Sequence, residues 1–272
     1  NDILNFNEEI YRVTIYGDDS DGNWEDGGDD FINILGGSYS YSRGYIYAMG
    51  GNDQIVLEGN FNGNEGNFRI YGGYGDDTID ISKADNLLMD RDSANVQGNE
   101  GNDYIIGNNE SNLFLGGSGN DVFNGAGGND IFYGEDNYGN KDDGSLDTSV
   151  YSGSSTDYIV SRATDSDFGY VYYIQDTRDG SPDGLDTLYD IDLLRFNDGD
   201  IGIVDFYDRM AKGGSAGETI TGSEGDDLID GYGGDDTITG LGGDDIIIGG
   251  EGNDVLDGGS GTNRLYGDAG DD

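Results

Sequence analysis

Short apolar segments recur at a fixed interval along the last fifth of the chain. Six polar or glycine residues alternate there with three strand-type residues, as in Leu228–Asp230. The middle residue of each segment is apolar, and in a strand it points to the face opposite its two neighbours. We therefore expect short strands with one inward stack, formed by Ile229, Ile238, Ile247, Leu256 and Leu265.

Glycine and aspartate occupy fixed positions between these strands. Paired glycines three residues apart permit positive φ angles and a close approach of backbones in tight turns. The turn glycines, which also place backbone carbonyls, are Gly222, Gly225, Gly231, Gly234, Gly240, Gly243, Gly249, Gly252, Gly258 and Gly261. Two residues after each second glycine stands an acid or amide, at Asp227, Asp236, Asp245, Asp254, Asn263 and Asp272.

The nine-residue step brings these acids together. Two units make one coil of 18 residues, so alternate units stack about 4.8 Å apart. Asp227 then lies near Asp245, and Asp236 near Asp254. Carboxylates at that distance repel unless a cation lies between them. Calcium suits carboxylate and carbonyl oxygens, whereas magnesium demands a stricter octahedron and retains its waters. Aspartate also favours turns, but a turn alone does not require it at one repeated position.

The N-terminal half repeats this pattern with interruptions. We expect further ligands at Asp30, Asp53, Asp77, Asp103, Asp121 and Asp130. The matching turn glycines are Gly72, Gly75, Gly98, Gly101, Gly116, Gly119, Gly125 and Gly128. Three units depart from the pattern: Asn112 replaces the acid in one, Phe68 replaces it in another, and the segment 81–89 lacks its glycines. Calcium sites should be absent or weaker in those units.

These units resemble the nonapeptide G-G-x-G-x-D-x-U-x of the RTX (repeats-in-toxin) proteins, which bind calcium in a β-roll. The resemblance implies an all-β fold of calcium-stabilised parallel β-roll blocks, with several Ca²⁺ ions as cofactors. It also implies an extracellular or cell-surface location reached by type I secretion, with folding driven by calcium outside the cell. Extracellular modules bind calcium with Kd values of roughly 10⁻⁴–10⁻³ M.

The repeat disappears between residues 147 and 212. Alternating segments such as Tyr170–Asp176 and Leu185–Phe196, separated by turn clusters, predict a small antiparallel β unit with a sandwich-like arrangement. This stretch is similar to a segment that flanks repeats in large RTX proteins, with Asp190-Ile191-Asp192 where that segment has Asn-Ile-Glu. The predicted domains are thus an irregular roll (1–146), a flanking or capping unit (147–212) and a regular roll (213–272).

Composition narrows the functional classes. The chain has 57 acidic and 12 basic residues and a net charge of −45, so we expect no nucleic-acid partner, because the phosphates would be repelled. It has no cysteine and no histidine, which removes thiol nucleophiles, zinc–thiolate sites and the commonest general base. No run of 18 apolar residues exists to span a membrane. The acidic pairs belong to a repeat and none stands apart, so we expect no catalysis.

Two functions remain open at this point. The first is a calcium-binding structural module of a surface-layer, adhesin or filament protein. The alternative is the calcium and secretion module of an RTX toxin or secreted enzyme whose catalytic domain lies elsewhere. The chain starts at Asn1 and both ends fall inside a repeat unit, so we expect a piece of a longer protein, or a module whose copies stack end to end.

Overall fold

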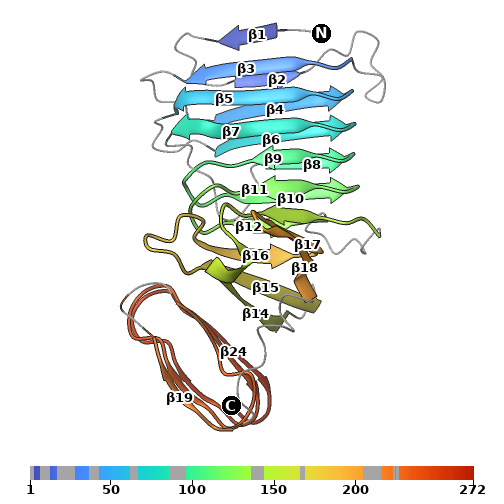
Figure 1. Ribbon diagram of the computed structural model, residues 1–272. Helices are drawn as coiled ribbons and strands as arrows, with labels where there is room; N and C mark the ends of the chain where they lie inside the picture. Colours follow the sequence, from blue (N-terminus) through green and yellow to red (C-terminus); the bar gives the residue numbers. More distant parts are fainter. Residues whose placement is uncertain are drawn as a thin grey trace.

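Two rolls of stacked β-coils, with an antiparallel unit between them, make up the computed structural model (Figure 1). The structure describes residues 3–6, 13–16, 28–36, 43–61, 67–85, 96–135, 144–165, 169–204, 216–222, 224 and 227–272. The fold is all-β with parallel sheets in both rolls, which confirms the fold class predicted from the repeat. Among the described residues, no helix is long and apolar enough to cross a bilayer.

The first roll consists of two parallel sheets that face each other. Sheet A contains, in spatial order, β1 (Ile3–Phe6), β3 (Phe31–Gly36), β5 (Gln54–Asn60), β7 (Thr78–Asp85), β9 (Tyr104–Ile106), β11 (Val122–Asn124) and β13 (Thr148–Val150). Sheet B contains β2 (Val13–Tyr16), β4 (Arg43–Gly50), β6 (Asn67–Tyr74), β8 (Val96–Glu100), β10 (Leu113–Ser118) and β12 (Ile131–Tyr133). Successive strands alternate between the sheets, so each pair of strands forms one coil.

The core of this roll lies between the two sheets. Strand register aligns the inward residues into two facing rows, and each of the following is at most 1% exposed: Ile32, Ile55, Ile79, Ile105 and Phe123 in sheet A, with Ile46, Ile70, Val96, Phe114 and Phe132 in sheet B. The rings of Phe123 and Phe132 stack across the layers with centroids 5.4 Å apart. Burial of this continuous apolar stripe is the main favourable term for the first roll.

Antiparallel strands extend both sheets at the C-terminal end of the first roll. In sheet B, β16 (Leu185–Tyr189) pairs with β12 and is followed outward by β15 (Gly169–Asp176) and β14 (Tyr158–Asp165). In sheet A, β17 (Leu193–Phe196) pairs with β13 and is followed by β18 (Gly199–Gly202). The unit therefore covers the open edges of the first roll. Because the sheets run on without a break here, the predicted three-domain division stays a prediction.

The second roll is smaller and more regular. Its two sheets contain β19 (Thr219–Thr221), β21 (Thr237–Thr239) and β23 (Val255–Asp257) in sheet C, and β20 (Leu228–Asp230), β22 (Ile246–Glu251) and β24 (Arg264–Ala269) in sheet D. Among the described residues its buried core consists of Ile229, Ile238 and Ile247, with Ile220 and Leu256 partly buried beside them. Leu265, on the last coil, is 43% exposed.

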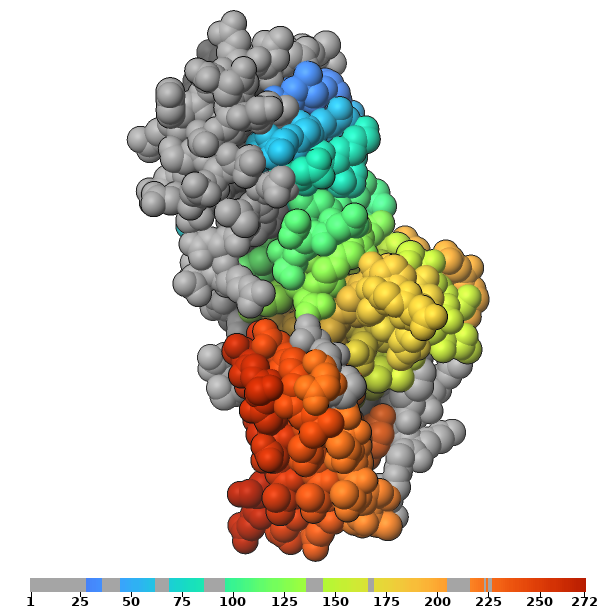
Figure 2. Space-filling view, turned by 90° about the vertical axis from the view of Figure 1, so that its left-hand side faces the viewer, coloured from blue at the N-terminus to red at the C-terminus, as the bar shows by residue number. Residues whose placement is uncertain are grey.

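Sheet D of the second roll packs against the flanking unit through its outer face. Leu228, Ile246 and Ile248 join Val171 and Tyr173 in one apolar cluster. The Tyr173 hydroxyl donates a hydrogen bond of 2.5 Å to the Tyr266 hydroxyl across this contact. Figure 1 shows the first roll from the side and the second along its axis, so the two rolls run in different directions. Figure 2 shows the second roll beside the flanking unit.

Candidate metal centre

A ladder of buried aspartates follows one edge of sheet A. The Oδ1 atom of each acid accepts the backbone N–H of the acid one coil earlier, at 2.7 Å from Asp30 to Asp53 and at 2.8 Å from Asp53 to Asp77. The same 2.8 Å bond joins Asp77 to Asp103 and Asp103 to Asp121. Each acid immediately precedes its strand, so the parallel register of the strands places all of them on one edge.

The second oxygen of most of these acids is buried and has no hydrogen-bond partner among the described residues. This unsatisfied atom is Oδ2 of Asp53, Asp77, Asp103, Asp121, Asp130, Asp236 and Asp254. An uncompensated buried carboxylate costs several kcal/mol, and native proteins rarely leave one without a partner. The same defect repeated at equivalent positions in both rolls therefore indicates a cationic partner.

Burial also changes the protonation of these acids when no cation is present. It raises the pKa of Asp53 to about 7 and that of Asp77 to about 8, with repulsion from neighbouring acids adding to the effect. It raises the pKa of Asp103 to about 7 and that of Asp121 to about 9. Burial, followed by repulsion from Asp186, holds the pKa of Asp130 well above its usual value. A bound cation would reverse these shifts by favouring the charged form.

Backbone carbonyls converge on the unsatisfied oxygens. A Cβ atom on Gly231 would lie 2.5 Å from Asp236 Oδ2 and 2.6 Å from the Gly249 carbonyl oxygen. A Cβ atom on Gly98 would overlap Asp103 Oδ2 and lie 2.8 Å from the Gly116 carbonyl oxygen. The first glycine of these units is thus required because a carboxylate and a carbonyl of the next coil share the space beside it. Within the described ranges no three acidic side chains converge, so carbonyls must complete any ligand set.

The second glycine of each unit is required for a different reason, which is its backbone conformation. Gly101 has a φ angle of +138°, which L-residues rarely adopt. A Cβ atom there would also overlap the Gly75 carbonyl oxygen of the previous coil. This glycine therefore lets the turns of successive coils stack closely. Carboxylate oxygen plus clustered carbonyl oxygen, without nitrogen or sulfur, is the ligand chemistry that calcium prefers.

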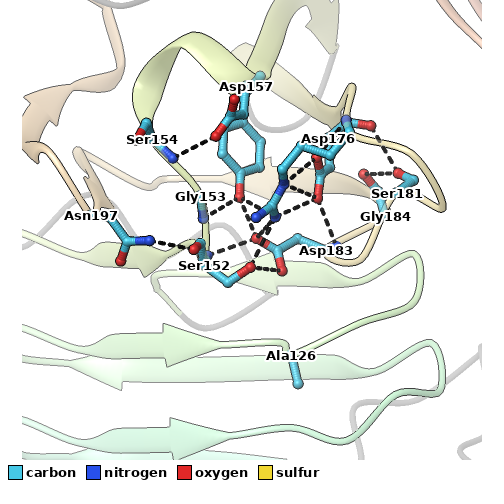
Figure 3. A network of polar contacts seen from close by, with 12 residues as sticks. Ala126, Ser152, Gly153, Ser154, Asp157, Asp176, Ser181, Asp183, Gly184 and Asn197 are labelled. Carbon is cyan, nitrogen blue, oxygen red and sulfur yellow. Dashed lines mark hydrogen bonds and ion pairs between the residues drawn. The ribbon is translucent and has the colours of Figure 1, made fainter.

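In the flanking unit, unlike in the ladders, a basic side chain neutralises the buried carboxylates. Arg178 contacts Asp176 at 2.6 Å and Asp183 at 3.1 Å. The Tyr158 hydroxyl donates to Asp183, and the Ser152 backbone N–H donates to it at 2.7 Å (Figure 3). Within the described residues, no lysine or arginine plays that part for the carboxylates of Asp53, Asp77 or Asp103. The ladder acids therefore differ from these structural ion pairs.

The predicted ligands fall on four edges, two in each roll. Asp30, Asp53, Asp77, Asp103 and Asp121 share the ladder of sheet A, whereas the Asp130 Oδ1 atom accepts the N–H of Asn112 at 2.7 Å on the other edge. In the second roll the edges hold Asp236, Asp254 and Asp272, and Asp227, Asp245 and Asn263. Gly225 and the Phe68 side chain lie outside the described residues. The ligand assignment itself remains a prediction.

Asn112 shows what the departure from aspartate does. Its Oδ1 atom accepts the N–H of Asn108 at 3.0 Å, and its Nδ2 atom donates to Asn108 Oδ1 at 3.0 Å. The amide is therefore satisfied by the protein itself, although Asn112 is only 2% exposed. An uncharged and already paired oxygen fits the expectation of an absent or weaker site in this unit.

Three further acids extend the ladders and were missed from the sequence. Asp147 accepts the N–H of Asp121 at 2.8 Å, Asp192 accepts the N–H of Asp147 at 3.1 Å, and Asp186 accepts the N–H of Asp130 at 2.8 Å. The glycine five residues before the acid is absent at all three, and only Asp186 keeps the glycine two residues before it, at Gly184. One sequence signal remains, because an apolar residue follows two positions after Asp186 and Asp192. These residues are Leu188 and Leu194, and both are fully buried.

A second, exposed ladder stands one residue before the acids and was also missed. Asn52 donates its N–H to Asp29 Oδ1 at 2.9 Å, and Asp76 donates to Asn52 Oδ1 at 3.0 Å. Asn102 and Asn120 continue it with bonds of 2.8 and 3.0 Å. Amides separate the carboxylates in this row, which limits like-charge repulsion. The sequence signal is the Gly-Asn-Asp or Gly-Asp-Asp triplet of each unit.

Comparison with known proteins identifies the repeat. The sequence model of the RTX calcium-binding nonapeptide repeat matches four times, at residues 59–82, 106–137, 212–247 and 239–272. No curated protein matches the chain significantly. Among solved structures, the extracellular lipase LipA from Serratia marcescens matches with 18% identity over 70% of this chain and 34% of the lipase, at a TM-score of 0.20. The chain thus spans about a third of that protein, and so low a TM-score carries no argument.

The matched segments coincide with the coils just described. Two lie in the first roll, and the other two together cover the second roll. They include Asp77, Asp121 and Asp130 of the first roll and Asp236 and Asp254 of the second. The repeats in these four segments are therefore RTX calcium-binding nonapeptide repeats, and the ion that such repeats bind is Ca²⁺.

Proposed function

We propose that this chain is a calcium-binding structural module of a protein that works outside the cell, in a surface layer, an adhesin or an extracellular filament. The observation that carries the proposal is the row of buried, unpartnered Oδ2 atoms at equivalent positions of both rolls. For Asp77, Asp103 and Asp236 this oxygen lies beside a backbone carbonyl of the next coil. The arrangement supports ion binding and rigidity rather than catalysis.

The proposed ligands are the twelve repeat positions predicted from the sequence, with carbonyls from the turn glycines. Metal-free, the chain carries a net charge of −45, and self-repulsion opposes a compact state. Each Ca²⁺ neutralises two of those charges, so its binding free energy becomes folding free energy. Low calcium inside a cell would then keep the chain open for type I secretion, and higher calcium outside would fold it.

The experiment is a calcium titration of the isolated chain, followed by far-UV circular dichroism and by sizing, with magnesium as the control. The proposal predicts a gain of β-structure with a midpoint of roughly 10⁻⁴–10⁻³ M calcium and little response to magnesium. Growth of the particle in the same calcium range would support a surface assembly, since open coil edges can pair with further coils. Full β-structure in chelator, unchanged by calcium, would contradict the proposal.

The alternative is a calcium module attached to a toxin or secreted enzyme. It shares the calcium response and differs in what surrounds the module. A catalytic domain elsewhere in the full-length gene would favour it, whereas many further copies of this module would favour the surface protein. Sizing separates the two as well, because an enzyme appendage should stay monomeric when it binds calcium.

A further inference from the structure

One column of residues on the outer face of sheet B has positive φ angles in every coil from β4 to β10. Strand register aligns Met49, Gly73, Asn99 and Gly117 in this column. Their φ angles are +83°, +123°, +79° and +116°. A Cβ atom on Gly73 would overlap the Met49 carbonyl oxygen, and one on Gly117 would overlap the Asn99 carbonyl oxygen. Both positions therefore require glycine, and the surface of the sheet is bare there.

Larger side chains stand on both sides of this column. On one side are Tyr47 and Tyr71, whose rings stack with centroids 4.8 Å apart and planes 2° apart. On the other side are Tyr74 and Glu100, which the same strand register aligns. Tyr74 is 38% exposed, and Glu100 is exposed as well. The bare glycine positions between these two rows form a groove that runs across the strands, along the axis of the first roll.

Two adjoining hollows make up this groove, each with a volume of about 310 Å³. One is lined by the stacked tyrosines and Gly73, and the other by Gly117. Asn99 and Glu100 line both hollows, so the two are continuous. The groove crosses four strands, which at about 4.8 Å per step makes it roughly 14 Å long. Its shape suits a segment of an extended polymer better than a compact molecule.

The groove combines aromatic walls with polar groups that are available to a ligand. Among the described residues, the Asn99 side chain makes one long hydrogen bond, of 3.5 Å from Nδ2 to the Gln97 carbonyl oxygen, and Glu100 forms no ion pair. The amide can donate and accept hydrogen bonds, and the carboxylate can accept them. Stacking already holds the Tyr47 and Tyr71 rings in place, so binding costs little side-chain entropy there. A few polar groups beside aromatic side chains are the usual lining of a ligand site.

Charge narrows the class of polymer that fits. The charged side chains that line the groove, Glu100 and Glu135, are both acidic, and the chain carries a net charge of −45. Nucleic acid and acidic polysaccharides are therefore repelled. A basic peptide would find acidic side chains over much of the surface and would gain little selectivity here. A neutral polysaccharide has apolar C–H faces for the tyrosine side chains and hydroxyl groups for Asn99 and Glu100.

We propose that the groove between the Tyr47–Tyr71 stack and the row of Tyr74 and Glu100 binds a neutral polysaccharide. The proposal rests on the adhesin form of the proposed function, to which it gives a ligand. Sugar rings pack against the tyrosine side chains, and their hydroxyl groups form hydrogen bonds with Asn99 and Glu100. Calcium acts on this site only by holding the coils whose register aligns the groove.

The test is calorimetric titration of the calcium-loaded full chain with four neutral probes, maltohexaose, cellohexaose, mannohexaose and chitohexaose, and with hexagalacturonate as the acidic probe. The variants are Tyr74→Ala, which truncates an exposed side chain, and Asn99→Gly, which removes the amide but readily adopts the φ angle of +79°. Tyr104→Ala is the matched control, because Tyr104 is also 38% exposed but lies on the outer face of sheet A.

We expect at least one neutral probe to bind with a Kd of roughly 1 mM or below, and hexagalacturonate not to bind. Tyr74→Ala and Asn99→Gly should each weaken that binding about tenfold, whereas Tyr104→Ala should leave it unchanged. Binding of no neutral probe, or equal binding by wild type and both groove variants, would overturn the proposal. So would a preference for hexagalacturonate.

Circular dichroism of the same samples separates this proposal from the proposed function. A chain that gains β-structure with calcium but binds no neutral probe would overturn the groove and leave the calcium-binding module intact. A chain whose structure does not respond to calcium would overturn the proposed function, and the titrations would still decide whether the groove binds sugar.

Discussion

The two rolls use the same turn chemistry but differ in how their coils are filled. Successive acids are 18 residues apart in the second roll, whereas in the first roll they are 23, 24, 26 or 18 residues apart. Insertions are therefore tolerated between a strand and the next turn. What each unit of the sheet A ladder keeps is an acid directly before the strand and one inward apolar residue two positions later. The length of a coil can vary as long as these two features stay in register.

The rolls also differ in their sources of stability. The first roll has a continuous cluster of buried isoleucine and phenylalanine side chains that reaches into the flanking unit. The second has three buried core residues and a docked outer face. Fully burying one such side chain contributes about 1.5–3 kcal/mol, so the second roll has far less apolar stabilisation. Its fold should depend on bound ions and on contact with the flanking unit.

Substitution of a core residue should produce the largest difference in stability between the two rolls. Ile238→Ala and Ile105→Ala both truncate a fully buried side chain, at a cost of about 2–5 kcal/mol. In the second roll that loss removes a third of the core, so we expect β19–β24 to lose hydrogen-exchange protection at saturating calcium. In the first roll the surrounding cluster should hold most of its protection. Equal protection of both rolls in the two variants would contradict the difference.

Removal of one ladder carboxylate should have the next largest effect. Asp236→Asn keeps the Oδ1 atom but removes the charge from a residue that is 1% exposed, and we expect at least tenfold weaker calcium binding by the second roll, about 1.4 kcal/mol. Asp235→Asn is the matched control, because Asp235 is exposed and belongs to the second, exposed ladder, one residue before the buried acid. Calorimetric titration measures both. Similar affinities would mean that the buried acids are turn formers only.

The pH dependence should be opposite without and with calcium. Metal-free, burial raises the pKa of Asp53 to about 7 and that of Asp121 to about 9, above the unfolded value near 3.8. The folded first roll then binds more protons than the unfolded chain, so this stability is complete below about pH 4 and is lost as pH rises through 7 to 9. Calcium binds the deprotonated acids, so its affinity should rise over the same range.

Urea unfolding of the metal-free chain checks the direction of this change in stability with pH. The midpoint for the first roll should lie at a higher urea concentration at pH 5 than at pH 8.5, and saturating calcium should remove or reverse the difference. A metal-free midpoint that increases between pH 5 and pH 8.5 would contradict the raised pKa values of the ladder acids.

The smallest effect should come from the contact between the second roll and the flanking unit. Tyr266→Phe removes the hydrogen bond from the Tyr173 hydroxyl and leaves the ring in place. We expect a loss of about 1 kcal/mol from the stability of the second roll, with the first roll unchanged. Chemical unfolding of the calcium-bound chain, followed by a probe in each roll, measures it. A larger loss in the first roll would contradict docking through this face.

The sequence predicted the features that depend on fixed spacing. A nine-residue step with an acid before each strand is enough to place Asp236 beside Asp254, because the coil length then equals two units. It did not reveal Asp147, Asp186 and Asp192. In the flanking unit the sequence separation rises to 45 between Asp147 and Asp192 and to 56 between Asp130 and Asp186, which hides any period. Only the strand pairing brings these residues back into register.

Docking of the second roll was missed for a different reason. An isolated roll strand should alternate apolar and polar residues, but the segment Ile246–Ile248 is apolar throughout, and all three side chains are buried. That run indicates burial on both faces of sheet D. The partner surface, on β14 and β15, is far away in sequence and has no periodic relation to it. Which surface covers the second face is therefore visible only in the structure.

The most direct test of the central claim is hydrogen exchange of the intact chain, resolved by segment, in calcium and in chelator at neutral pH. The account predicts that removal of calcium abolishes protection in β19–β24 while β5–β12 keep part of theirs, because their apolar core remains. Restored calcium should return protection to both rolls. Equal protection of the second roll with and without calcium would contradict the claim that bound calcium holds this roll folded.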